Sequence, residues 1–185
     1  MDSKFPRQEF PILLTNRLRL REVRDADISD FFKIRSNADN MRFIPRPLAE
    51  SEQDIIDFLK VGKELYQNGE MINFAIALKD SDKFIGSIGF YRTKWHADRT
   101  ELGYILSPEY RGKGYIHEAV MEMIRFAFED IGFHSLEAII DPRNTASINV
   151  VEKAGFIKEG HITANDYWNG EYLDTLIYSL INTSN

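Results

Sequence analysis

The sequence contains no cysteine, so disulfide bridges, thiolate metal sites and cysteine nucleophiles are excluded. It also has no apolar run that approaches the roughly 18 residues of a membrane-spanning helix. The first residues, Met1 to Pro6, do not form the apolar core of a signal peptide. We therefore expect a cytoplasmic protein that does not enter a membrane.

An excess of positive charge is missing as well. The chain has 23 Lys and Arg residues against 29 Asp and Glu residues, a formal net charge of −6. Nucleic-acid-binding proteins usually present a broad basic surface, so this balance argues against nucleic acid as a partner. Histidine is scarce, and His117, His134 and His161 lack the spacing of metal ligands, so we expect no metal site.

What is present indicates a globular protein. Hydrophobic residues make up 43% of the 185-residue chain and aromatic residues 12%. That composition favours a packed core over disorder, and the length suits one domain. Without an internal repeat, low-complexity tract or linker, residues 1–185 are predicted to form a single domain.

The apolar pattern predicts mixed α/β architecture (α+β) around one central, mostly antiparallel sheet of about seven strands with about four helices. Asp25 is expected to cap the first helix, and Ser51 and Asp54 form a capping-box variant before the second. Residues 37–47 read as a loop. The predicted strands are 17–23, 72–78, 84–91, 100–106, 135–141 and a hairpin around Trp168–Glu171, and the remaining helices are 116–131 and 144–154.

One glycine-containing segment, Arg111-Gly-Lys-Gly114, lies where the strand 100–106 ends and a helix begins. Free backbone N–H groups at a helix start, the helix dipole and two neighbouring cations make this a plausible anion site. An ordinary glycine turn with exposed Arg and Lys side chains explains the segment alone equally well.

Two motifs together indicate a family. Arg111-Gly-Lys-Gly-Tyr-Ile116 matches the pattern Gln/Arg-x-x-Gly-x-Gly/Ala, and Asn144-x-x-Ser147 is followed by Glu152-Lys-Ala-Gly-Phe156. With Thr15–Arg21 near the start, the sequence resembles the GNAT superfamily of acetyl-CoA-dependent N-acetyltransferases. Within that superfamily it is most similar to the RimJ/RimL-type ribosomal-protein N-terminal acetyltransferases.

The resemblance implies the GNAT fold and a V-shaped slot between the strand 104–106 and the strand 136–141. Acetyl-CoA would be the co-substrate, with no metal required. The cofactor-binding residues implied are Tyr104, Ile105 and Leu106 for pantetheine, backbone N–H groups of Arg111, Gly112, Lys113, Gly114, Tyr115 and Ile116 for pyrophosphate, and Asn144 for the pantetheine arm.

The sequence departs from the family pattern twice. Ile116 stands where Gly or Ala is usual, and Val151 stands where many members have a tyrosine general acid. Because valine cannot donate a proton to the leaving thiolate, Ser147 becomes the candidate donor. A plain helix-start serine is the alternative explanation of Ser147.

Attack by an amine requires that its proton be removed, and Glu101 is the first candidate for the general base. A surface carboxylate is the alternative reading of Glu101, and His96, Asp98 or a water chain are the competing bases. Phe43, Tyr91, Trp95 and Tyr167 are candidates for an acceptor pocket, although each could equally be packing in the core or its rim.

By resemblance, the reaction is direct transfer of the acetyl group to a primary amine in a ternary complex. The expected acceptor is a protein or peptide N-terminal α-amine, for example of a ribosomal protein. Acetylation of a small amine such as a polyamine, an amino acid or an antibiotic remains open, as does a non-catalytic acyl-CoA-binding module. A monomer and a homodimer are both compatible with the sequence.

Overall fold

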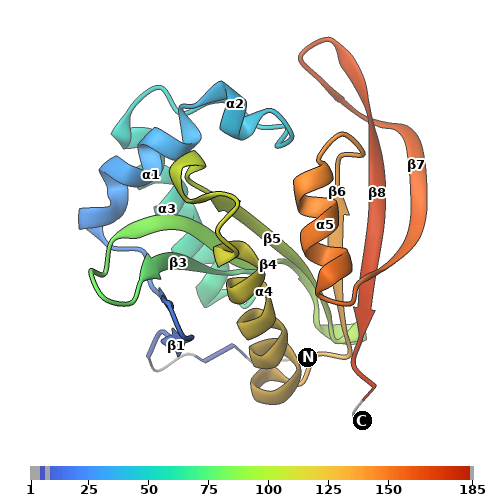
Figure 1. Cartoon of the computed structure of the whole chain (residues 1–185), viewed down its shortest axis with the longest axis horizontal. Coiled ribbons are helices and arrows are strands. Elements are labelled where there is room, and N and C mark those ends of the chain that lie inside the picture. The colour runs from blue at the N-terminus through green and yellow to red at the C-terminus, as the bar shows by residue number, and fades with distance from the viewer. Residues whose placement is uncertain (1–4, 7–8, 184–185) are drawn as a thin grey trace.

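The computed structural model describes residues 5–6 and 9–183. Over these residues eight strands form one sheet in the order β1-β2-β3-β4-β5-β6-β8-β7 (Figure 1). All neighbouring pairs are antiparallel except β5 and β6. The strands are β1 Leu13–Leu14, β2 Leu18–Arg21, β3 Ile72–Leu78, β4 Phe84–Lys94, β5 Arg99–Leu106, β6 Ser135–Ile140, β7 Ile157–Trp168 and β8 Glu171–Ile181.

Helices cover both faces of the sheet. The α-helices are α1 Ile28–Arg35, α2 Ala38–Met41, α3 Glu52–Gln67, α4 Tyr115–Arg125 and α5 Thr145–Lys153, and α4 continues into a π-helical segment, Phe126–Ile131. Strand β3 shows how the faces divide, because Phe74 packs in the core with α4 whereas Ala75 packs in the core with α1 and α3. Period-two alternation along the strand produces this division.

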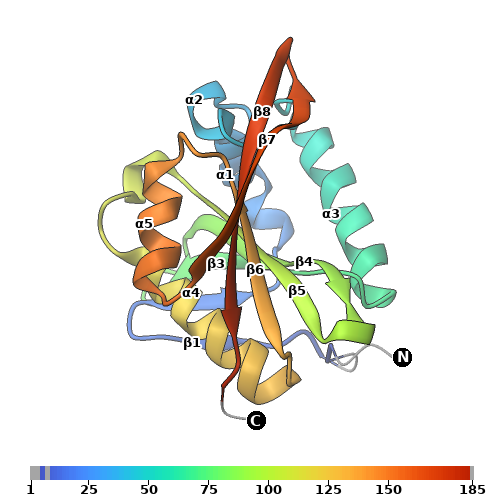
Figure 2. The ribbon, with the colours of Figure 1, turned by 90° about the vertical axis from the view of Figure 1, so that its right-hand side faces the viewer.

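The antiparallel part of the sheet ends at a short parallel seam. β5 pairs with β6 only from Arg99 opposite Ser135 to Glu101 opposite Glu137. Beyond Glu101 the two strands have no further paired residues, although β5 runs on to Leu106 and β6 to Ile140 (Figure 2). A strand–helix–strand unit is the usual way to place two strands in parallel, and here α4 is that helix.

The last two strands form a long hairpin that projects past the end of β6 (Figure 1). Asn169 and Gly170 lie at its tip with φ angles of 48° and 86°. Positive φ at both central residues is typical of a type I′ turn, which Asn-Gly favours. The hairpin predicted around Trp168–Glu171 is therefore confirmed.

Several details differ from the sequence-based expectation. The two-residue strand β1 raises the strand count from about seven to eight over the described residues. The helix α2 forms inside the segment expected to be a loop, with the Asn37 side chain accepting from the Asn40 N–H. Asp25 lies within a short 3₁₀ turn, and the Asp27 carboxylate instead accepts the Arg24 N–H at 2.8 Å.

The capping box at α3 is confirmed, since the Asp54 carboxylate accepts the Ser51 N–H at 2.9 Å. No helix formed by the described residues has both the length and the apolar character needed to cross a bilayer.

Candidate active site

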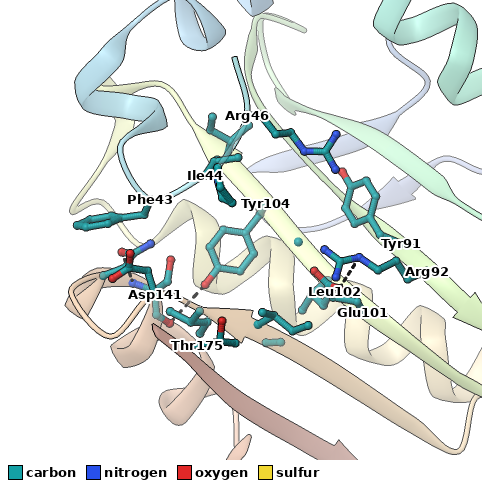
Figure 3. A pocket seen from close by; sticks show the side chains of 18 of the residues that line it. Phe43, Ile44, Arg46, Tyr91, Arg92, Glu101, Leu102, Tyr104, Asp141 and Thr175 are labelled. Carbon is teal, nitrogen blue, oxygen red and sulfur yellow. Dashed lines mark hydrogen bonds and ion pairs between the residues drawn. The ribbon is translucent and has the colours of Figure 1, made fainter. Parts of the chain in front are cut away.

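A cavity of about 970 Å³ opens where β5 and β6 diverge. One wall comes from β5, including Glu101 and Tyr104, and the opposite wall comes from residues 138–140 of β6 and Asp141 just after it. The start of α5 adds Asn144 and Ser147. Figure 3 shows Tyr104 and Glu101 on β5 facing into this cavity. The edge of β5 that faces β6 therefore has no strand partner beyond Glu101, which leaves its peptide groups available to a ligand in the slot.

The glycine segment lies between the end of β5 and the start of α4. Gly112 and Gly114 have φ angles of 71° and 80°, a region that glycine enters without steric cost. Within the described part of the chain, no hydrogen bond is formed by the backbone N–H groups of residues 112–116. A helix N-terminus with several free N–H groups is a ready-made site for a phosphate-like anion.

Arg17, the residue before β2, holds this segment in place through Glu118 of α4 and the Lys113 carbonyl. Arg17 Nε lies 2.6 Å from Glu118 Oε2, the Arg17 N–H donates to Oε1 at 2.7 Å, and Arg17 Nη1 donates to the Lys113 carbonyl at 3.0 Å. The Thr15 hydroxyl also donates to Glu118, at 2.6 Å. The pKa of Glu118 is lowered because these bonds outweigh the burial that would raise it.

The side chains of the two cations in the segment are already in contact with protein groups. Arg111 Nη2 donates to Asn40 Oδ1, which ties the segment to α2, and the Arg111 N–H donates to the Pro108 carbonyl. The Lys113 ammonium lies 5.4 Å from the centre of the Tyr110 ring. The free N–H groups therefore begin at Gly112.

Glu101 lies at the apex of the slot, opposite Tyr91 on β4 and Glu137 on β6. Its side chain is only 13% exposed, and burial raises its pKa, partly offset by Arg92. Arg92 Nε is 3.1 Å from Glu101 Oε2, but this oxygen accepts no hydrogen bond, because the N–H does not point at it. A buried carboxylate with a raised pKa and a free lone pair has the properties of a general base.

Asn144 and Ser147 form the first turn of α5. The Asn144 side chain accepts the Ser147 N–H at 3.2 Å, so it caps the helix. The Ser147 hydroxyl lines the cavity and lies beside the Tyr104 hydroxyl, which lowers the raised pKa of Tyr104 slightly. From across the slot the Tyr104 hydroxyl points at the Ser147 carbonyl oxygen at 3.4 Å, and burial raises the pKa of Tyr104 to about 12.

The aromatic residues expected at the acceptor pocket divide into two pairs. Phe43 and Tyr91 line the cavity, and the Tyr91 hydroxyl donates to Asn73 Oδ1 at 2.7 Å. Trp95 does not line it, because its indole N–H donates to the Gly69 carbonyl and its ring stacks on Phe133 in the core. Tyr167 is 58% exposed on the hairpin and packs against Tyr172, away from the cavity lining.

The competing bases His96 and Asp98 are also outside the cavity lining. They lie in and just after a 3₁₀ turn at the far end of β5, where the Asp98 carbonyl accepts the N–H groups of His134 and Ser135. Of the three candidate side chains, Glu101 alone reaches the slot. Among the described residues, no group of three or more His, Asp or Glu side chains is arranged to hold a metal ion.

Three site features were missed by the sequence reasoning. Arg17 was treated only as part of a β-strand pattern, and the Tyr104 side chain was overlooked in favour of its backbone. Arg35 and Arg46, which line the acceptor side of the cavity, were not singled out at all. Pro45 and Pro47 around Arg46 were the signal that its loop holds a fixed shape.

Comparison with known proteins decides the family. The family model described as "Acetyltransferase (GNAT) domain" matches residues 17–157 of the chain. The chain belongs to the GNAT acetyltransferase family. The resemblance seen in the sequence is thereby confirmed, as are the GNAT fold and the assignment as an N-acetyltransferase.

Individual relatives of this acetyltransferase have different substrates in their names. The uncharacterized N-acetyltransferase YoaA of Bacillus subtilis is 33% identical over 172 residues, covering 93% of this chain and 97% of YoaA. RimL, a ribosomal L7/L12 α-N-protein acetyltransferase solved with coenzyme A, superposes with a TM-score of 0.86 at 18% identity, covering 95% of this chain and all of RimL. Spermidine N-acetyltransferase from Vibrio cholerae, solved with CoA and spermine, superposes with a TM-score of 0.80 at 18% identity. The superposition covers 90% of this chain and 96% of the spermidine enzyme. The last two similarities establish the shared fold.

Proposed function

We propose that this GNAT acetyltransferase transfers the acetyl group of acetyl-CoA to a primary amine by direct attack in a ternary complex. The observation that carries the proposal is the slot between β5 and β6, together with the free N–H groups of residues 112–116 between the end of β5 and the first turn of α4. An unpaired strand edge suits the amides of pantetheine, and the helix start suits a pyrophosphate. CoA bound to RimL and to spermidine N-acetyltransferase supports the same donor here.

The chain's own residues fit this co-substrate. Gly112 has open space where a Cβ would stand, so a phosphate can approach the backbone closely. Asn144 lines the slot opposite β5, within reach of the pantetheine arm. When bound, acetyl-CoA supplies an activated thioester carbonyl; the protein supplies position, a base and a proton donor.

Glu101 is the proposed general base. An ammonium group has no lone pair for attack, so the acceptor must lose a proton before it reacts. Burial raises the pKa of Glu101, which brings its basicity closer to that needed near neutral pH. A peptide α-amine has a pKa of only about 7.7–8.0, so such an acceptor needs only a weak base.

Ser147 is the proposed proton donor to the leaving thiolate. Its hydroxyl lines the slot next to the Tyr104 hydroxyl, whereas Val151 is buried and has no proton to give. Tyr104 is the second candidate, since its hydroxyl reaches the same place from β5. Its pKa of about 12 keeps it protonated at neutral pH.

The proposed acceptor is a protein or peptide N-terminal α-amine, supported by the structural similarity to RimL. A small amine is the alternative, supported by the relationship to spermidine acetyltransferases. A non-catalytic acyl-CoA-binding module is disfavoured, because such a module has no need for a buried carboxylate at the apex of the slot.

A thiol-release assay tests the proposal directly. Acetyl-CoA is mixed with the protein and a panel of N-terminal peptides, polyamines and amino acids, and free CoA is measured. Turnover with peptides and not with polyamines is expected. Turnover confined to polyamines would overturn the peptide acceptor, and tight CoA binding with no turnover on any amine would overturn the enzymatic function.

A further inference from the structure

Three arginines, Arg35, Arg46 and Arg92, line the acceptor side of the cavity. Arg92 forms an ion pair with Glu101, with Arg92 Nε 3.1 Å from Glu101 Oε2. Arg35 and Arg46 form no ion pair with any residue that the structure describes. Elsewhere in the chain Arg21, Arg99, Arg125 and Arg143 pair with carboxylates, so one wall of this cavity holds two guanidinium groups that lack such a partner.

Arg35 lies in partly apolar surroundings, whereas Arg46 is exposed. Arg35 is half-buried at the end of α1, with its guanidinium carbon 4.6 Å from the centre of the Phe58 ring. Burial lowers the pKa of Arg35, and the positive charge of Arg46 lowers it further. The two cations are therefore close enough to repel each other.

Arg46 also faces the reacting end of the cavity. It extends from the loop after α2 toward the Tyr91 hydroxyl, with Glu101 beyond (Figure 3). Its charge favours the ionised forms of both Tyr91 and Glu101. A group bound between Arg35 and Arg46 would thus lie near an amine held at Glu101.

The half-buried charge of Arg35, which has no counter-charge, raises the free energy of the empty pocket, and the nearby charge of Arg46 adds to that cost. A carboxylate would relieve the repulsion and accept paired N–H bonds, which the planar guanidinium fork offers in a fixed geometry. A polyamine would bring further positive charge to the same wall and would be repelled. On this wall Arg35 and Arg46 thus favour a carboxylate over a cation, while the cavity lining also includes Glu70, Asp141, Asp166 and Asp174.

We propose that Arg35 and Arg46 form an anion subsite that binds a carboxylate carried by the acceptor close to its reacting amine. The inference rests on the proposed function, because it presupposes an amine acceptor at Glu101. Either an acidic side chain next to a peptide N-terminus or the α-carboxylate of a free amino acid supplies this chemistry.

The test compares peptides that differ at one position, Ser-Glu-, Ser-Gln- and Ser-Lys- with the same neutral remainder, together with free serine. The kcat/KM for the Glu peptide is expected to exceed that for the Gln peptide by about tenfold, as one charge-assisted bond suggests. The Lys peptide is expected to be the poorest. If free serine is turned over as well as the Glu peptide, the α-carboxylate is the group recognised.

Variants assign the preference to the two arginines. Arg35→Gln and Arg46→Gln should each bring the Glu/Gln ratio toward one, and Arg46→Glu should favour the Lys peptide over the Glu peptide. Arg42→Gln is the matched control, because Arg42 is exposed on the same loop, stacks on Phe43 and does not line the cavity. This control should keep the wild-type ratio.

Calorimetric binding of the same ligands in the presence of CoA separates the two proposals. If nothing is acetylated but the Glu peptide or free serine binds more tightly than the Gln peptide, the proposed function fails and the anion subsite stands. The subsite is overturned if the wild type neither acetylates nor binds the Glu peptide or serine better than the Gln peptide. It is also overturned if both Arg→Gln variants keep the preference.

Discussion

Glu101 owes its properties to its place at the end of the β5–β6 seam. It is buried where two strands separate, so its carboxylate is shielded from bulk water yet faces the slot. Removing a hydration shell disfavours the charged form of a carboxyl group. The same position therefore accounts for both its raised pKa and its access to a bound amine.

We expect Glu101→Gln to lower kcat by about 100-fold, the usual contribution of a general base. The melting temperature of Glu101→Gln at pH 8 should be equal to or above that of the wild type. A carboxyl whose pKa is raised on folding stabilises the protein at low pH, and that stability is lost as pH rises through the raised pKa. Glutamine does not ionise, so the variant does not lose this stability at high pH. An activity assay measures the change in kcat, and melting curves at two pH values measure the change in stability.

The companion variant is Arg92→Gln. Arg92 lowers the pKa of Glu101, so its removal should move the acidic limb of the pH–rate profile to higher pH. An unchanged limb in an active Arg92→Gln enzyme would show that Glu101 is not the group titrating in that profile.

The two hydroxyl candidates can be separated by single-atom deletions. Ser147→Ala keeps the N–H that Asn144 caps, so the start of α5 should be intact. It is expected to lower kcat by about tenfold to 100-fold, while Tyr104→Phe lowers it less. Pre-steady-state thiol release measures the affected step, and the opposite ranking would transfer the donor role to Tyr104.

At the scale of elements, the donor site depends on contacts far apart in sequence. Arg17 of the strand β2 region holds the carbonyl of Lys113 and the carboxylate of Glu118, about 100 residues away along the chain. Its guanidinium also lies 4.5 Å from the centre of the Tyr115 ring. The segment that offers its N–H groups is thus fixed from outside by a neighbouring element.

Arg17→Gln should therefore raise KM for acetyl-CoA by several-fold to about tenfold, the cost expected for a half-exposed ion pair with added hydrogen bonds. The value of kcat at saturation should change little, because Arg17 touches none of the proposed reacting groups. Arg19→Gln is the control on β2, since Arg19 has only a 3.7 Å contact with Asp82. A drop in kcat with unchanged KM would argue against a positioning role.

The elements of the fold were largely predictable because their signals are local. Alternation predicted β2, short apolar runs predicted β3 to β6, the Ser51–Asp54 pair predicted the start of α3, and Asn169-Gly170 predicted the final hairpin. The helix α2 was missed because Asn37 and Asp39, with prolines following, read as turn residues. Local patterns also placed Glu101, Ser147 and the glycine segment on the correct elements.

Which side chains meet across the slot was not predictable in the same way. Trp95 and Tyr167 have the residue type of an acceptor pocket, but long-range packing directs Trp95 to Phe133 and Tyr167 to Tyr172. Arg35 on α1 and Arg46 on the loop after α2 line the same cavity only in the folded chain. Such contacts depend on tertiary geometry that no window of sequence contains.

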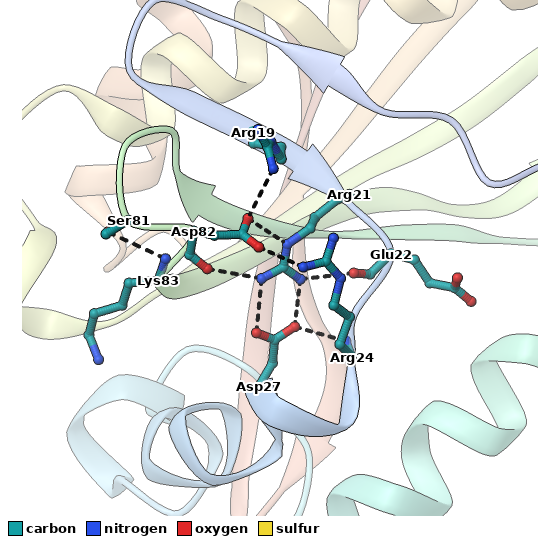
Figure 4. A network of polar contacts seen from close by, with 8 residues as sticks. All are labelled: Arg19, Arg21, Glu22, Arg24, Asp27, Ser81, Asp82 and Lys83. Atoms are coloured by element: carbon teal, nitrogen blue, oxygen red, sulfur yellow. Dashed lines mark hydrogen bonds and ion pairs between the residues drawn. The ribbon is translucent and has the colours of Figure 1, made fainter.

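At the scale of the whole molecule, a polar network fastens the first strands to α1 (Figure 4). Arg21 is almost fully buried and makes a bidentate pair with Asp27 at 2.7 and 3.0 Å, while its Nε donates to Asp82 at 3.0 Å. Arg24 adds a 2.6 Å bond to Asp82. The network therefore joins β2, α1 and the β3–β4 turn.

Asp82→Asn tests the network with little change in shape. Asp82 has φ of 54°, a conformation that asparagine adopts readily, so the backbone should tolerate the exchange. Because the pairing groups outweigh burial and lower the Asp82 pKa, the native carboxylate stabilises the fold near neutral pH. We expect a loss of about 1–2 kcal/mol at pH 7.

The pH dependence of that loss gives the control. A carboxyl whose pKa is lowered on folding contributes stability above its ordinary pKa of about 4, and the contribution disappears as pH falls through the lowered value. Wild type and Asp82→Asn should therefore converge in melting temperature toward pH 3. A constant gap from pH 7 to pH 3 would assign the loss to something other than the charge.

The three-residue seam between β5 and β6 also has a mechanical meaning. The sheet is continuous on either side, but at its middle only Arg99–Glu101 and Ser135–Glu137 join the two halves. A co-substrate lying in the slot would take the place of a strand and connect the unpaired parts of β5 and β6. Amide exchange along residues 102–106 and 138–140 should then slow when CoA is added, so that donor binding converts two loosely coupled halves into one cooperative folding unit.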